Sequence, residues 1–151
     1  MSLQDQLPQI TQGAVAWAQA HAARIAKDGE SLSPKLIGLA KKVGVLQPEL
    51  IRILRVPTVP FPEEPMLREA ARQTGLVDGE TAGLTLGHGI YVVSRHETVR
   101  LLSHEFRHVH QYEAHGGIAG FLEAYLRQIV AVGYSDAPLE IDARRHERTR
   151  C

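Results

Sequence analysis

Apolar residues recur along most of this chain at the i, i+3 and i+4 spacing of an amphipathic helix. Glycine, proline and capping residues divide this pattern into separate segments, as at Asp28-Gly29 and Gly133. Ser94 and Glu97 predict a capping box at the start of one of them. The expected helices cover residues 9–27, 34–43, 62–72, 95–115, 118–132 and 138–147.

Two other segments carry the signals of β-strands. Residues 50–56 are rich in branched side chains and are followed by prolines, which favours a strand at or near a sheet edge, with a helical start over residues 48–54 as the alternative. Apolar and small or polar residues alternate through residues 82–94 on both sides of Gly87-His88-Gly89, a pattern typical of a β-hairpin. The chain therefore predicts an α+β fold, mostly helical, with a small antiparallel β-sheet beside the helix at 95–115.

That helix carries the candidate chemistry. His104 and His108 lie four residues apart on one helix face, so their imidazole nitrogens can converge on one metal ion, for which zinc is the natural choice. Glu105 lies about 100° round the helix from His104, where a carboxylate can take a proton from metal-bound water. This His-Glu-x-x-His pattern is that of zinc peptidases. The simpler interpretation is a solvated or hydrogen-bonded pair of histidines.

Length and charge limit the kinds of partner. The 151 residues predict a single domain, residues 1–151, that can bury a core without disulfides. Seventeen basic and 17 acidic residues give a net charge of zero, which argues against binding to nucleic acid or to an anionic membrane. The start of the chain lacks the features of a signal peptide, and no apolar run reaches the roughly 18 residues of a membrane span. With Cys151 as the only cysteine, we expect a cytoplasmic protein.

A catalytic zinc ion usually takes three protein ligands, so this helix alone leaves one ligand missing. His110 points to the other side of the helix, about 200° from His108, and His115 lies about 10 Å further along it. Glu140 is the best placed residue, in the first turn of a separate helix. The other downstream candidates are Glu123, Asp142, His146 and Glu147.

Two segments together resemble a known group of proteins. His104-Glu105-Phe106-Arg107-His108, followed after 31 further residues by Glu140, resembles the gluzincins, zincins in which a glutamate on a second helix is the third zinc ligand. The portion from Glu140 to Ala143 is similar to that of the heat-shock and prenyl-protein membrane proteases, without their transmembrane helices. The run His108-Val109-His110-Gln111-Tyr112 is similar to small bacterial zincin-like proteins of unassigned function.

The resemblance implies a zincin-like fold with one zinc ion on His104, His108 and Glu140. It covers residues 82–147, which hold the hairpin, the motif helix and the helix of the third ligand. Residues 1–75, the expected helical scaffold and edge strand, match no family in this way.

The chain departs from those proteases at one position. They carry an aspartate after the alanine, whereas Arg144 stands here and Asp142 lies two residues earlier. The carboxylate that would orient a ligating histidine is therefore unassigned. Tyr112, Tyr134 and His146 have the chemistry to stabilise an oxyanion, although each also fits a structural role.

We therefore expect a zinc-dependent, metallopeptidase-like hydrolase that acts on a peptide or protein, with Glu105 activating a zinc-bound water. The alternative is a non-catalytic, zincin-like metal-binding interaction module. The small size of the chain and the missing aspartate favour this module, whereas the intact Glu105 favours the enzyme, because a purely structural metal site has no use for such a carboxylate.

Overall fold

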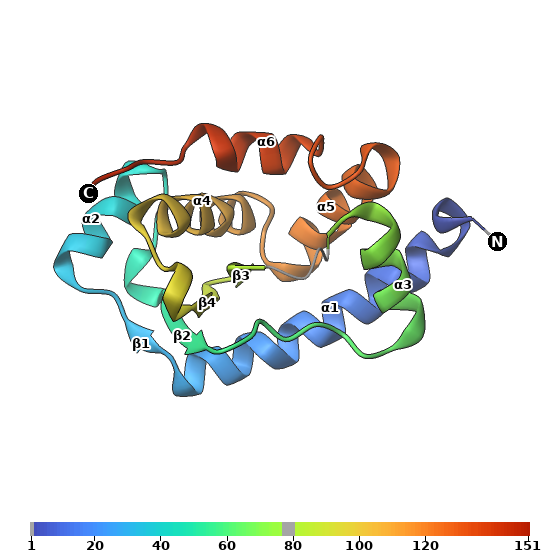
Figure 1. Ribbon diagram of the computed structural model, residues 1–151, viewed down its shortest axis with the longest axis horizontal. Coiled ribbons are helices and arrows are strands. Elements are labelled where there is room, and N and C mark those ends of the chain that lie inside the picture. Colours follow the sequence, from blue (N-terminus) through green and yellow to red (C-terminus); the bar gives the residue numbers. More distant parts are fainter. Residues whose placement is uncertain (1, 77–80) are drawn as a thin grey trace.

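The computed structural model describes residues 2–76 and 81–151, which form six α-helices and a four-stranded mixed β-sheet (Figure 1). The helices are α1 (Leu3–Asp28), α2 (Pro34–Lys42), α3 (Pro65–Thr74), α4 (Val99–Ala114), α5 (Ile118–Val132) and α6 (Pro138–Arg145). The strands are β1 (Glu30–Ser31), β2 (Arg52–Val56), β3 (Gly83–Leu86) and β4 (Gly89–Val93), and 3-10 turns cover Pro48–Leu50 and Ser94–His96. The predicted α+β class is thus confirmed.

The sheet has the strand order β1-β2-β4-β3. The hairpin of β3 and β4 was predicted correctly and is antiparallel, but β2 pairs with β4 in parallel, so the expectation of a purely antiparallel sheet is wrong. Parallel neighbours need a long crossover connection, and here the connection contains α3. All five residues of β4 are buried, as expected of a strand covered on both faces.

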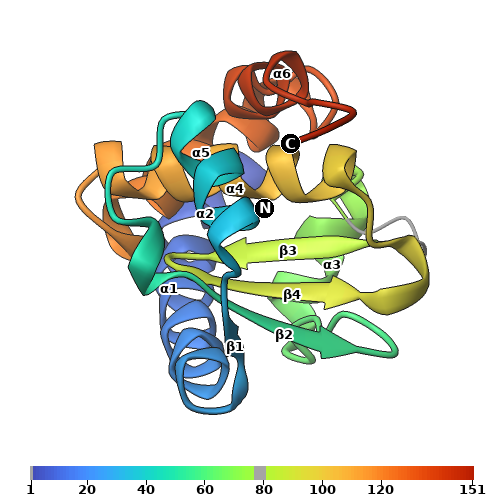
Figure 2. The same ribbon diagram turned by 90° about the vertical axis from the view of Figure 1, so that its left-hand side faces the viewer.

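The two faces of the sheet carry separate cores, and Figure 2 shows α1 on one side of the strands and α2 and α4 on the other. Ile90 and Val92 of β4 pack with residues of α2 and α4, whereas Tyr91 and Val93 belong to the core that contains α1 and α5. This alternation follows from the two-residue period of a strand. It places α4 directly over the sheet, beside the edge strand β3.

Several predicted helix boundaries are wrong because side chains have other partners. Helix α4 begins at Val99, not at residue 95: the Thr98 side chain accepts a hydrogen bond from the Leu101 backbone N–H, while the Glu97 carboxylate is paired with Arg55 at 2.7 Å. The expected capping box at residue 94 is therefore absent. Helix α1 begins at Leu3, not at residue 9, because Ser2 caps it and Pro8 lies inside it.

The remaining boundary differences are small. Helix α3 begins at Pro65, not at residue 62, and Glu64 caps it. Both interpretations of the segment after Pro48 apply in part, since a 3-10 turn precedes strand β2. No helix within residues 2–76 and 81–151 is long and apolar enough to cross a membrane.

Candidate metal centre

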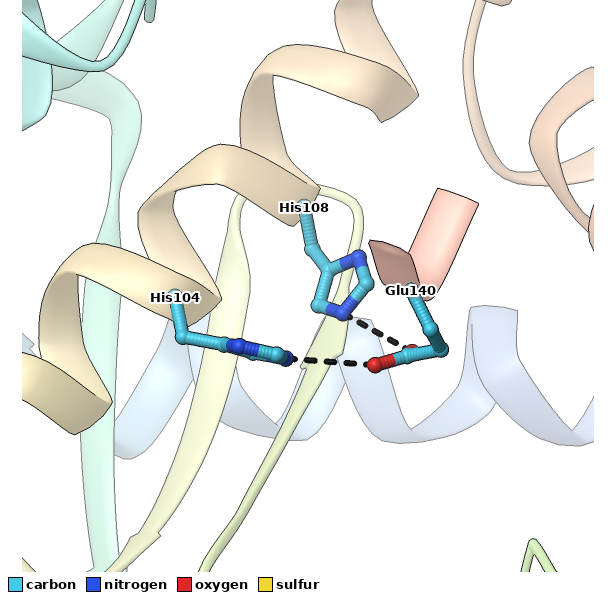
Figure 3. Close-up of side chains that lie close together, drawn as sticks. All are labelled: His104, His108 and Glu140. Atoms are coloured by element: carbon cyan, nitrogen blue, oxygen red, sulfur yellow. Dashed lines mark hydrogen bonds and ion pairs between the residues drawn. The ribbon is translucent and has the colours of Figure 1, made fainter. Parts of the chain in front are cut away.

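The fold brings together the three residues expected to be metal ligands (Figure 3). His104 and His108 project from α4, and Glu140 projects toward them from the first turn of α6. The Nε2 atom of His104 lies 3.2 Å from one carboxylate oxygen of Glu140, and the Nε2 atom of His108 lies 3.0 Å from the other. All three ligand atoms lie within 4.8 Å of one another.

Polar contacts between α4 and α6 fix this geometry. The Arg107 guanidinium donates to both oxygens of Asp142, at 2.8 and 3.3 Å. The Gln111 side-chain amide donates to the Leu139 carbonyl at 2.9 Å and to Asp142 at 2.8 Å. Asp142, one of the alternative ligands, is thus engaged in holding the two helices together. It is outside the donor cluster that the described residues form.

The outer nitrogen of each histidine also has a partner. His104 Nδ1 lies 2.9 Å from a carboxylate oxygen of Glu147. The next residue, Arg148, donates its backbone N–H to the Ser103 hydroxyl of α4, which holds this part of the chain against the helix. His108 Nδ1 lies 2.8 Å from the side-chain oxygen of Gln111. Both acceptors favour a proton on Nδ1, so the two Nε2 atoms, which face Glu140, are the ones that could bind a metal ion.

Glu147 therefore has the position expected of the orienting carboxylate that the sequence left unassigned. The sequence makes Glu147 a candidate ligand, whereas the structure places it behind His104. The sequence signal was weak, because Glu147 lies after the end of α6 at Arg145 and no helical period predicts its direction.

The charges of the cluster shift its pKa values strongly. Burial lowers the pKa of His104, but the hydrogen bond to Glu140 and the negative charges of Glu105 and Glu140 outweigh it and raise this pKa to about 9. The pKa of His108 is also raised, against a lowering by burial, chiefly by Glu140. Burial would raise the pKa of Glu140, yet its hydrogen bonds to the two histidines hold it far below its ordinary value.

This charge distribution fits a divalent cation. Without metal, protons on the two Nε2 atoms hold the histidines to the Glu140 carboxylate. A metal ion would replace those protons, since imidazole binds metal only in its neutral form. Two imidazole nitrogens and one carboxylate oxygen form the kind of donor set that zinc takes in catalytic sites, with a further position left open.

Tyr125 provides a further contact to the cluster. Its hydroxyl donates to the second oxygen of Glu140 at 2.8 Å. Burial first, and then the charge of Glu140, raise the pKa of Tyr125 well above its ordinary value, so the phenol stays neutral and remains a donor. We did not predict this role from the sequence, where Tyr125 has the spacing of a core residue of α5.

Glu105, the expected general base, is 5 % exposed and held by strand β3. The Thr85 hydroxyl donates to a carboxylate oxygen of Glu105 at 2.8 Å, and the Tyr112 hydroxyl donates to the Thr85 carbonyl at 3.0 Å. Gly83 lies so close that a Cβ atom there would be 3.2 Å from the Glu105 Cγ. A residue without a side chain at position 83 thus lets β3 approach the carboxylate.

A cleft of about 450 Å³ connects these groups. His104, Glu105, His108 and Glu140 line it, and so does Tyr134. Tyr112, Tyr134 and His146 have the chemistry to stabilise an oxyanion, and of these Tyr134 and Tyr112 line the cleft. Tyr112 donates its hydroxyl hydrogen to the Thr85 carbonyl. The third, His146, binds the backbone carbonyl of Asp142 through Nδ1.

The remaining candidates have other partners, and none belongs to the donor cluster formed by residues 2–76 and 81–151. His110 binds the Gly44 carbonyl and His115 the Gln111 carbonyl. Glu123 is paired with Arg127 at the surface.

Comparison of the chain with protein families, with curated proteins and with solved structures gave no match. The arrangement of the donors, of Glu105 and of the cleft therefore carries the functional argument.

Proposed function

We propose that this protein is a zinc-dependent peptide hydrolase of zincin-like fold, with zinc bound by His104, His108 and Glu140 and with Glu105 as general base. One observation carries the proposal: the buried carboxylate of Glu105, which is not part of the His-His-Glu donor set, is held beside that set in the same cleft. The charge of Glu105 raises the pKa of both histidines, as expected of a neighbour.

Zinc on these donors would supply a Lewis acid that polarises a peptide carbonyl and lowers the pKa of water. Glu105 accepts one proton from the attacking water as its oxygen bonds to the carbonyl carbon. Glu105 then delivers this proton to the leaving nitrogen as the C–N bond breaks. The hydrogen bond from Thr85 to one oxygen of Glu105 holds the carboxylate in place and leaves the other oxygen for the water.

The edge of β3 is suited to hold an extended peptide. The Val93 N–H donates to the Ala82 carbonyl, so the backbone groups of Ala82 face strand β4. Backbone direction alternates along a strand, so Gly83 and Thr85 direct their backbone groups to the outer edge of the sheet. The contact of the Tyr112 hydroxyl with the Thr85 carbonyl on that side agrees with this direction. Thr85 is buried and its carbonyl already accepts from Tyr112, so Gly83 is the position at which the main chain of a substrate could pair with β3 next to Glu105.

The alternative function is a metal-binding interaction module without turnover. One observation favours it: the two histidines, Glu140 and Tyr125 satisfy one another by hydrogen bonds, so the cluster can join α4 to α6 as a structural element. The two functions differ in whether Glu105 takes part in catalysis as a general base.

Glu105→Gln separates them, since glutamine is nearly isosteric and cannot accept the proton. Wild type and Glu105→Gln, each confirmed to hold one zinc ion per chain, would be incubated with the same peptide library, with and without chelator. If the protein is a peptide hydrolase, Glu105→Gln should lower the rate of peptide cleavage by about 10²–10⁴-fold at unchanged zinc content. The exposed Glu123 of α5 gives the control, Glu123→Gln, which should cleave as wild type does. Equal cleavage by wild type and Glu105→Gln would exclude this site as the source of activity.

A further inference from the structure

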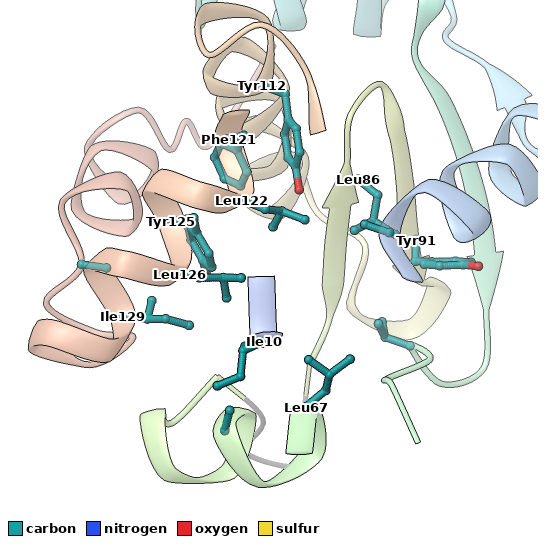
Figure 4. Packing of buried hydrophobic residues seen from close by; sticks show 14 of the residues in the cluster. Ile10, Leu67, Leu86, Tyr91, Tyr112, Phe121, Leu122, Tyr125, Leu126 and Ile129 are labelled. Atoms are coloured by element: carbon teal, nitrogen blue, oxygen red, sulfur yellow. The ribbon is translucent and has the colours of Figure 1, made fainter. Parts of the chain in front are cut away.

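The cleft continues from the donor cluster to an apolar end between α1 and α5. Trp17 and Ala14 of α1, Leu122 and Leu126 of α5, and Phe61 from the segment after β2 line it. Figure 4 shows Leu122 and Leu126 directed from α5 toward β3. Residues 1–75, which carry no catalytic motif, thus supply three of these five lining residues.

The aromatic side chains of α5 join this apolar end to the donors. Tyr125 lies between Leu122 and Leu126 in the sequence and binds Glu140, while its ring centroid lies 6.3 Å from that of His108. Residues three and four apart on a helix are neighbours on its surface. The apolar end therefore begins within one side-chain length of the proposed metal ligands.

The two ends of the cleft differ in charge. The five residues named above carry no charge, whereas Arg100 and Glu147, 3.4 Å apart, line the cleft elsewhere. A charged group that entered the apolar end would lose its hydration without gaining an ionic partner from those walls, which is unfavourable. A large apolar side chain would instead gain by leaving water.

We propose that this apolar end is a specificity subsite that receives a large apolar side chain, such as that of phenylalanine or leucine, from the residue beside the cleaved bond of a peptide. The inference rests on the proposed peptide hydrolysis. It commits to a peptide because the apolar end is continuous with the β3 edge, where Gly83 can hold a main chain. Burial of such a side chain favours binding by about 10- to 100-fold over a peptide with alanine there.

Binding can be tested without turnover. Glu105→Gln protein, metal-free and zinc-loaded, would be titrated by calorimetry with acetylated, amidated heptapeptides of alanine and serine that carry phenylalanine, leucine, alanine or aspartate at the centre. Trp17 is the only tryptophan of the chain and lines the subsite, so its fluorescence gives a second, local readout. The phenylalanine and leucine peptides should bind about 10- to 100-fold more tightly than the alanine peptide, and aspartate should bind most weakly.

A pair of variants on α1 locates the preference. Ala14→Leu adds bulk inside the subsite and should bring the affinities for the phenylalanine and alanine peptides together. Ala16→Leu makes the same change at an exposed position of α1 and should keep the preference. If Ala14→Leu fails to fold, Phe61→Ala decides: it removes a wall outside the helices and strands and should reduce the preference.

Equal binding of the phenylalanine, alanine and aspartate peptides, or a preference that survives Ala14→Leu and Phe61→Ala, would overturn the subsite. The result is separable from the proposed function. A preference in Glu105→Gln protein together with an inactive wild type would support the subsite and refute peptide hydrolysis. Cleavage by wild type without preference for apolar residues would do the reverse.

Discussion

Raising the pH should weaken the metal-free protein in a defined range. The folded state raises the pKa of His104 from 6.5 to about 9. At about 1.4 kcal/mol for each pKa unit, this shift stabilises the folded metal-free protein by about 3 kcal/mol. The contribution is fully present below pH 6.5, where His104 is protonated in both states. It is lost as the pH rises toward 9, because the folded state must then give up a proton that the unfolded state has already released.

Other shifted groups titrate outside this window. The pKa of His21 is lowered by burial and then by Arg24, so His21 makes stability rise with pH, but only below pH 6.5. The shifts of Glu140 and Glu113 act below their ordinary pKa of 4.5. The pKa of His108 is also raised, so among the described residues His108 adds to the effect of His104 in the same direction.

The assay is urea unfolding in the presence of chelator, from pH 6.5 to 9.5. The free energy of unfolding should fall by about 3 kcal/mol across the range, and Glu140→Gln, which removes the carboxylate facing both histidines, should abolish most of the slope. Zinc-loaded wild type should lose the slope or reverse it, because metal takes the place of the protons. A constant or rising stability of the metal-free protein would refute the protonated His-Glu-His arrangement.

Three further predictions concern the site. Glu140→Ala should lower zinc affinity by orders of magnitude because it removes a ligand, whereas Asp142→Ala should cost at most about 10- to 100-fold; equal losses in a competition titration would contradict the ligand assignment. Glu147→Gln should lower zinc affinity about 10- to 100-fold, measured in the same way, because it removes the carboxylate behind His104. Gly83→Ala should keep zinc but lower peptide cleavage, since its Cβ would press on the base; full activity at equal zinc content would contradict this.

Local periodicity was enough to predict much of the fold. The six helices and the hairpin have short-range signals: apolar spacing, and glycine or proline at their ends. The parallel pairing of β2 with β4 has none, because β2 precedes β4 by more than 30 residues and any strand order fits the local pattern. The predicted start of α4 is wrong for a similar reason: Arg55, which is distant in the sequence, forms an ion pair with Glu97, so Glu97 does not cap the helix.

The site divides in the same way. The spacing of His104 and His108 on one helix is a local property, and Glu140 could be chosen because it opens a separate helix. The supports of Glu105 and His104 come from β3 and from the chain after α6, as Thr85 and Glu147, and no sequence period links them to α4. Tertiary packing alone determines these contacts.

The donors lie on two helices far apart in sequence, Glu140 being 36 residues from His104. A metal ion on these donors would act as a cross-link, and tying a loop of this length removes about 4 kcal/mol of chain entropy from an unfolded chain, if the ion remains bound there. The loop encloses all of α5, whose buried face helps to form the core. Loss of the ion would remove this cross-link and leave α6 held to α4 by hydrogen bonds and ion pairs alone, so proteases should cut the metal-free protein faster than the metal-loaded one.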